Sequence, residues 1–209
     1  TIYVKTASPS PVFFSEYAEG GSGYNKYLEI YNSSDAEIDL SGYAILGNGN
    51  GGPFNDTLRF DANTILASQE VYVIAHAEAD PIILAEADKV IANPFNNPEG
   101  DPDSYIVSFN GDDARAIAKI EGSGFNVIDI IGTLSGGDPG NGWDVAGVTD
   151  GTTNHTLIRK SSVSFGNADW LSSAGTSADN SEWIVKDDLD WTNIGCHNAE
   201  CASNAPVLS

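Results

Sequence analysis

Short runs that alternate between apolar and polar residues dominate the chain, and each such run predicts a strand. The clearest covers residues 26–32, where Leu28 and Ile30 fall on one face and their neighbours on the other. Turn residues (Gly, Asn, Asp and Ser) separate the runs. Further strands are predicted at residues 12–17, 38–46, 58–60, 64–66, 70–76, 105–109, 114–120, 126–133, 155–160 and 182–186. Many short strands between turns indicate an all-β domain.

Three local signals add detail to this pattern. Asp80 followed by Pro81 predicts a short helix at residues 80–87, because aspartate caps a helix and proline fits its first position. Asn110-Gly111 lies between two apolar runs, which predicts a hairpin that joins residues 105–109 to residues 114–120. Ser41-Gly42 predicts a kink or a bulge within residues 38–46.

The chain of 209 residues is long enough for one large β-domain with its own core. We divide it into an entry segment (residues 1–11), a domain (residues 12–197) and a tail (residues 198–209). The alternation also predicts which side chains face inward. The expected core residues are Leu28, Ile30, Val71, Val73, Ile106, Ile117, Ile128 and Ile130.

Acidity is the extreme feature of the composition, with a formal net charge of -21. Such a surface repels phosphate backbones, so direct binding of nucleic acid is not expected. The acidity can serve solubility, or some carboxylates can gather around Ca²⁺, a cation that prefers oxygen ligands. No apolar run approaches the length of a transmembrane helix.

Acidic residues in two neighbouring loops form the candidate metal site. They are Glu99, Asp101, Asp103, Asp112 and Asp113. The spacing of an EF-hand is missing, and aspartates in turns also bond their own backbone, which is the alternative role of the last two. A second candidate region near the C-terminus contains Asp187, Asp188 and Asp190.

The two cysteines, Cys196 and Cys201, lie close together near the C-terminus. With one nearby histidine they make a poor zinc site, because a structural zinc site needs four ligands. A local disulfide is the better interpretation, and it predicts an oxidising compartment.

Two tryptophans in loops are candidate binding residues. Trp143 and Trp170 lie in Gly- and Ser-rich surroundings, where an exposed indole ring could stack on a sugar. Trp183 lies beside Ile184 and Val185 and is expected in the core.

Arg159 falls inside a strand and is expected to form a buried ion pair with Glu16 or Glu29. The three histidines form no known catalytic motif.

Several segments, in their order and spacing, resemble bacterial lamin-tail domains. These segments are residues 12–20, 27–32, 40–43, 70–75, 79–82, 108–114, 127–132, 138–143, 156–160, 182–183 and 195–197. The resemblance implies an immunoglobulin-like β-sandwich. It also implies a context in large exported bacterial proteins, where such domains lie beside nuclease or phosphatase-like domains. It brings no catalytic residues.

These observations predict a non-catalytic module that binds or positions a partner for a larger exported bacterial protein, secreted or at the cell surface. The partner would be a polysaccharide, a cell-surface protein or an adjacent domain of the same chain, with Ca²⁺ as a stabilising ion. One alternative is a metal-dependent hydrolase that uses the acidic loops, as an accessory part of an extracellular nuclease or phosphatase. Another is a structural spacer without a ligand.

Overall fold

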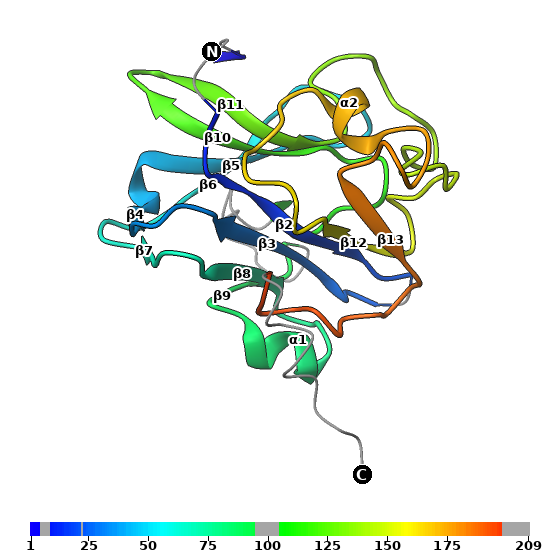
Figure 1. Ribbon diagram of the computed structural model, residues 1–209, viewed down its shortest axis with the longest axis horizontal. Helices are drawn as coiled ribbons and strands as arrows, with labels where there is room; N and C mark the ends of the chain where they lie inside the picture. Colours follow the sequence, from blue (N-terminus) through cyan, green and yellow to red (C-terminus); the bar gives the residue numbers. More distant parts are fainter. Residues whose placement is uncertain (5–8, 22, 95–104, 198–209) are drawn as a thin grey trace.

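The computed structural model describes residues 1–4, 9–21, 23–94 and 105–197. Two β-sheets lie face to face, and a two-stranded ribbon lies at one side (Figure 1). The first sheet has the order β1 (Ile2–Tyr3), β11 (Gly124–Ile131), β10 (Arg115–Glu121), β5 (Tyr43–Gly47) and β6 (Asp56–Arg59). The second sheet has the order β13 (Trp183–Lys186), β12 (His155–Arg159), β2 (Val12–Glu19), β3 (Lys26–Asn32), β8 (Val71–His76) and β9 (Lys89–Ile91). The ribbon consists of β4 (Ile38–Asp39) and β7 (Ile65–Leu66).

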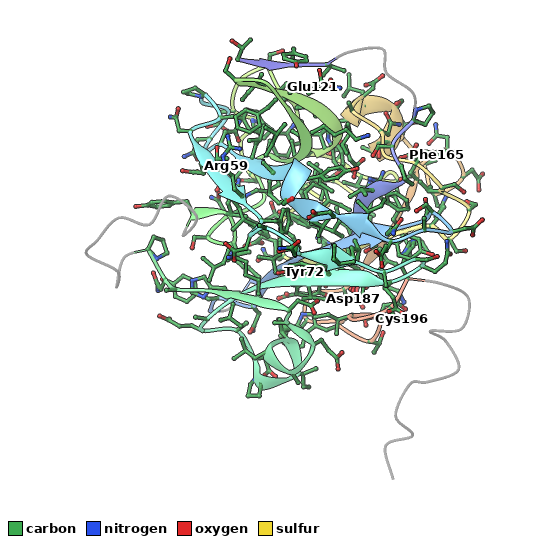
Figure 2. All side chains as sticks on the ribbon, turned by 90° about the vertical axis from the view of Figure 1, so that its left-hand side faces the viewer. Arg59, Tyr72, Glu121, Phe165, Asp187 and Cys196 are labelled. Atoms are coloured by element: carbon green, nitrogen blue, oxygen red, sulfur yellow. The ribbon has the colours of Figure 1, made fainter. Side chains whose placement is uncertain are left out.

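This arrangement confirms the expected immunoglobulin-like β-sandwich. Side chains from both sheets fill the space between them (Figure 2), and the expected core residues are buried except Val71, which is half-buried. Trp183 is fully buried, as expected. Val73 packs on the outer face of the second sheet with Tyr27 and Ile83, in a smaller apolar cluster. Among the described residues, no helix reaches the length and hydrophobicity that a membrane crossing requires.

The local signals for helix and kink are confirmed. Helix α1 (Pro81–Glu86) begins after Asp80, whose Oδ1 accepts a hydrogen bond from the Ile82 N–H at 2.9 Å. A 3₁₀ turn at Leu40–Gly42 divides the strand expected at residues 38–46 into β4 and β5. The sequence did not predict β1, β9 or a second short helix, α2 (Trp170–Ala174). The first two are strands of two or three residues, too short to show alternation.

The hairpin expected across Asn110-Gly111 is wrong, because residues 105–109 form no strand. Both edges of β10 are already paired, one with β5 and one with β11. The guanidinium of Arg115 instead donates hydrogen bonds to the carbonyl oxygens of Ile106 and Tyr105 at 2.8 and 2.9 Å. The actual hairpin joins β10 to β11 around Gly122, which has a positive φ of 60°.

A buried arginine joins the two sheets. Arg159 on β12 donates through Nη2 to both carboxylate oxygens of Asp129 on β11, each at 2.6 Å. Its Nη1 donates to Ser173 and Glu182, at 2.8 and 2.6 Å. Its Nε donates to the Phe14 carbonyl, while the Phe14 N–H donates to Asp129. The expected buried ion pair is therefore present, but its partners are Asp129 and Glu182, because Glu16 and Glu29 lie on the opposite face of the second sheet.

The outer face of the second sheet is covered by residues 187–197, which we call the C-terminal segment (Figure 1). Asp187 and Cys196, near its two ends, lie on the same side of the molecule as α1 (Figure 2). Beneath it, Glu16 and Glu29 are directly opposite each other on β2 and β3, and both are buried. The Gly195 N–H of the C-terminal segment donates to Glu29 at 2.7 Å.

Burial changes the protonation of this glutamate pair. It raises the pKa of Glu29 to about 8, against the opposing effect of hydrogen bonds from Ser15 and Gly195. Burial, and then the charge of Glu29, raises the pKa of Glu16 well above its usual value. Two ionised carboxylates this close together, with little water to screen them, repel each other strongly. The glutamate pair in the folded protein therefore keeps protons at pH values where exposed glutamates have lost them.

We predict that Asp129→Asn destabilises the protein strongly. The substitution leaves the buried guanidinium of Arg159 without its main charge partner, at a cost of about 3–5 kcal/mol. Urea unfolding measures this loss, with Asp61→Asn, at an exposed position, as the matched control. A loss below about 1 kcal/mol, the range of exposed pairs, would contradict a central role for this ion pair.

We also predict that stability falls between about pH 5 and pH 8. A carboxyl group whose pKa is raised on folding stabilises the fold below its unfolded pKa, and this contribution is lost as the pH rises through the folded value. The loss is on the order of 3 kcal/mol. Glu29→Gln, whose amide resembles the protonated carboxyl, should flatten the profile in urea unfolding, whereas Glu37→Gln at an exposed position should not. An unchanged slope in Glu29→Gln would contradict the assignment.

Candidate ligand-binding site

The long loop between β11 and β12 closes one end of the sandwich, and buried Thr152 holds it in place. The hydroxyl oxygen of Thr152 accepts a hydrogen bond from the Trp143 N–H at 2.8 Å and donates to the Gly111 carbonyl at 2.6 Å. Its carbonyl accepts a hydrogen bond from the hydroxyl of Tyr17, a fully buried residue of β2. This loop is therefore tied to the core of the domain.

Glycines let three loops meet at this end. A Cβ on Gly111 would lie 1.8 Å from the Thr153 hydroxyl oxygen, and one on Gly51 would lie 2.2 Å from the Gly137 backbone. The loop at residues 47–53 thus contacts the long loop. Within it, Asn48 is buried, and its side chain accepts a hydrogen bond from the Ala114 N–H.

The first of two adjoining cavities in this region is polar and has a volume of about 550 Å³. Its lining comes from the end of β2, the turn at residues 110–113, the long loop and the start of β12. Lining residues include Glu19, Asp112, Asn141, Asp150, Asn154 and His155. Glu19 forms an ion pair with Lys26 and accepts a hydrogen bond from the Asn154 N–H. The Nδ1 atom of His155 lies 2.6 Å from the Thr153 carbonyl.

The second cavity is a more apolar groove of about 590 Å³, which we call the Trp143 groove. Its lining includes Trp143, Asp144, Asp150, Trp170 and Leu171, and Asp150 also lines the polar cavity. The Asp150 N–H donates to the Asp144 carboxylate at 3.0 Å, which holds the two acidic residues together.

The two expected ligand-binding tryptophans line this one groove, although they differ in exposure. Trp143 is half-buried, and Gly132 leaves room for its ring beside Ala114. Trp170 is only 3 % exposed and belongs to the core, against the expectation of a surface position. It is buried because it begins α2, which packs beside Trp183. Leu171, the next residue, is 75 % exposed.

The expected metal residues divide into three groups. Glu99, Asp101 and Asp103 lie outside the described residues. Asp113 accepts hydrogen bonds from the N–H groups of Asn50 and Asn110, at 2.8 and 3.1 Å, as an aspartate in a turn does. Asp112 lines the polar cavity.

The described residues contain no group of three His, Cys, Asp or Glu side chains placed to hold a metal. In the second candidate region, Asp188 accepts a hydrogen bond from Gly21 and Asp190 accepts one from Thr192. Cys196 lies near the end of the described chain, whereas Cys201 lies outside it, so their disulfide stays a prediction.

The sequence did not indicate Thr152, Asp150 or Leu171 as site residues. No motif marks them. Thr152 and Asp150 belong to the long loop, which folds back over the turn at residues 110–113, whereas Leu171 belongs to α2. The density of glycine in residues 47–53 and 132–151 was the one available signal, and it indicates close backbone approach rather than a ligand.

Comparison with known structures supports the fold. The chain is similar to the crystal structure of a DUF4876 family protein from Bacteroides thetaiotaomicron VPI-5482, with a TM-score of 0.50 and 16 % sequence identity. The similarity covers 95 % of this chain and 74 % of that one. Among curated proteins, no sequence matches this chain.

A family model, the Lamin Tail Domain, matches residues 5–132. The match runs from the entry segment to the end of β11, so it includes the turn at residues 110–113 and ends before the long loop. It confirms the resemblance to lamin-tail domains, and it suggests a non-enzymatic domain. The chain belongs to the lamin tail domain family.

Proposed function

We propose that this chain is a non-catalytic recognition module of a larger exported bacterial protein, and that it binds a carbohydrate in the Trp143 groove. The observation that carries the proposal is the pairing, in one groove, of a half-buried tryptophan with two carboxylates, Asp144 and Asp150. Such a groove offers an apolar surface and hydrogen-bond acceptors together, as ligand sites commonly do.

The chemistry of a sugar matches both halves of the groove. The C–H face of a sugar ring packs against an aromatic ring, here that of Trp143, with the exposed Leu171 extending the apolar surface. Sugar hydroxyl groups donate hydrogen bonds, and ionised carboxylates are their strongest acceptors. Asp144 is exposed and Asp150 is half-buried, so both lie near the surface.

The charge of the chain narrows the choice of ligand. A net charge of -21 disfavours nucleic acids and other polyanions, whereas a neutral polysaccharide meets no such repulsion. Export is supported by this acidity and by the closely spaced cysteines. A cell-surface protein or an adjacent domain of the same chain would also be a partner without phosphate groups, and the experiment below separates these partners from a glycan.

The groove is held ready for a ligand without rearrangement of the backbone. The N–H of Trp143 is bonded to Thr152, which is itself bonded to the turn at residues 110–113. The ring of Trp143 lies against Gly132, which follows β11, and packs against the hydrophobic core. Because these contacts are made before binding, little conformational entropy is lost when a ligand enters.

We predict that Trp143→Ala weakens binding to a responsive neutral polysaccharide about tenfold, through loss of the stacking contact. Binding is measured by calorimetry after a screen of immobilised neutral glycans. Leu171→Ala, at an exposed position that leaves the fold intact, should weaken binding by a smaller factor. Phe165→Ala removes an aromatic residue that is 50 % exposed outside the groove and should leave binding unchanged.

Two results would contradict the proposal. One is the absence of binding to any neutral glycan in the screen, which would favour a protein partner. The other is glycan binding that survives both Trp143→Ala and Leu171→Ala, which would locate the site elsewhere. Circular dichroism of each variant verifies that the β-sandwich is still formed.

A further inference from the structure

The polar cavity contains a buried carboxylate oxygen without a partner. Asp112 is only 6 % exposed, and its Oδ1 has no hydrogen-bond partner among the described residues. Its neighbour Asp113 differs, because both oxygens of that carboxylate accept backbone hydrogen bonds. Buried polar atoms in native proteins are nearly always satisfied by a protein group, water or an ion. The unpaired oxygen of Asp112 therefore points to a species that the cavity admits.

The cavity supplies further oxygen atoms from a second loop. Asp150 lines the cavity. One oxygen of its carboxylate accepts a hydrogen bond from the side-chain amide of Asn141 at 3.3 Å, which is a weak contact. Thr153 also lines the cavity and donates its hydroxyl proton to the Asn141 carbonyl, so the hydroxyl oxygen retains lone pairs. Asn154 also lines the cavity.

The charges around the cavity favour a cation. Glu19 is compensated by its ion pair with Lys26, but no such ion pair is found for Asp112 or Asp150 among the described residues. Burial, and then the nearby charge of Asp113, raises the pKa of Asp112. A bound cation would offset both effects, because an opposite charge favours the ionised form.

We infer that the polar cavity is a Ca²⁺ site, with Asp112 and Asp150 as its carboxylate ligands. Ca²⁺ takes six to eight oxygen ligands and accepts carboxylates, amides, carbonyls and water together. The oxygen-rich lining suits this ion better than zinc, which prefers sulfur and imidazole nitrogen. His155 is the one histidine in the lining, and its Nδ1 is already engaged with the Thr153 carbonyl.

The composition of the site sets its strength. No three acidic or zinc-type side chains converge within the part of the chain that the structure describes, so water must complete the coordination. The cavity of about 550 Å³ leaves ample space for water ligands. A site with few charged ligands belongs with the weak Ca²⁺ sites of extracellular modules, whose dissociation constants are about 10⁻⁴ to 10⁻³ M.

The inferred ion would link the two cavities. Asp150 lines both of them, so coordination would restrain its carboxylate at the edge of the Trp143 groove. Asp112 belongs to the segment that matches the lamin tail domain, whereas Asp150 belongs to the long loop that follows it. An ion held between them would stabilise the contact between these two parts of the chain.

Calorimetric titration of Ca²⁺ into the full chain, after treatment with EDTA, tests this inference without any glycan. We expect one Ca²⁺ site with a dissociation constant of about 10⁻⁴ to 10⁻³ M. Asp112→Asn and Asp150→Asn should each raise this dissociation constant roughly tenfold or more. Asp35→Asn is the matched control, because it removes the same charge from an exposed turn. Terbium luminescence gives a second readout, since the nearby indole of Trp143 can sensitise a bound lanthanide.

Three outcomes would overturn the inference. They are the absence of a binding signal at millimolar Ca²⁺, affinity that survives both cavity variants, and equal weakening by Asp35→Asn, which would reveal a diffuse counterion effect. Urea unfolding without Ca²⁺ verifies that the cavity variants fold. Because no sugar is present, failure of this experiment leaves the carbohydrate proposal standing, and failure of the glycan screen leaves the Ca²⁺ site standing.

Discussion

The ion pair between Arg159 and Asp129 is the contact on which the rest of the structure depends. It is fully buried between the two sheets, and its hydrogen bonds reach β2, α2 and the turn before β13. The guanidinium also stacks on Trp183, 4.0 Å from the ring centroid. A buried charge pair is costly unless all of its hydrogen-bonding groups are satisfied. Satisfying them requires each of these elements to take one position, and α2 in turn forms one wall of the Trp143 groove.

Arg115 is a second buried arginine whose hydrogen bonds fix the chain near the polar cavity. Its guanidinium bonds four carbonyl oxygens, and it lies over the ring of Phe109, 5.1 Å from the centroid. Phe109 stacks on Tyr17, whose hydroxyl group holds the long loop through Thr152. Two buried arginines thus connect an apolar core to the loops where recognition is proposed. The turn at residues 110–113 and the long loop are thus held by the core beneath them.

Much of the fold was predictable from periodicity and capping, which are local properties. The strands at residues 12–17 and 26–32 and the helix after Asp80 each carry their signal within a few residues. The failures arose where distant partners decide the outcome. Residues 105–109 resemble a strand, yet the carbonyl groups of Tyr105 and Ile106 bond a side chain rather than a neighbouring strand. The partners of Arg159 were misassigned because the alternation does not reveal which face of a strand meets the opposing sheet.

The same distinction applies to the candidate site. Asp112 and Trp143 were indicated by residue type, since loop carboxylates and loop tryptophans are common ligand contacts. Asp113 carried the same signal and has a structural role instead, because the local turn uses both of its oxygens. Thr152 carried no signal, since a threonine becomes an organising residue only when its partners, here Trp143 and Gly111, are brought to it. Residue type therefore suggested the chemistry, and the long-range contacts determined where it is assembled.

Strands β2 and β3 are buried on both faces, so every residue in them lies away from solvent. In a simple two-layer sandwich, one face of each strand would be exposed to solvent, and the residues on that face could be substituted freely. Here the C-terminal segment and α1 add a third layer, and both faces of these strands carry packing contacts. The protein should therefore tolerate almost no substitution of an apolar residue of β3 by a polar one. Its backbone amide protons should also be the slowest in the protein to exchange with deuterium, because they open only when the whole domain unfolds.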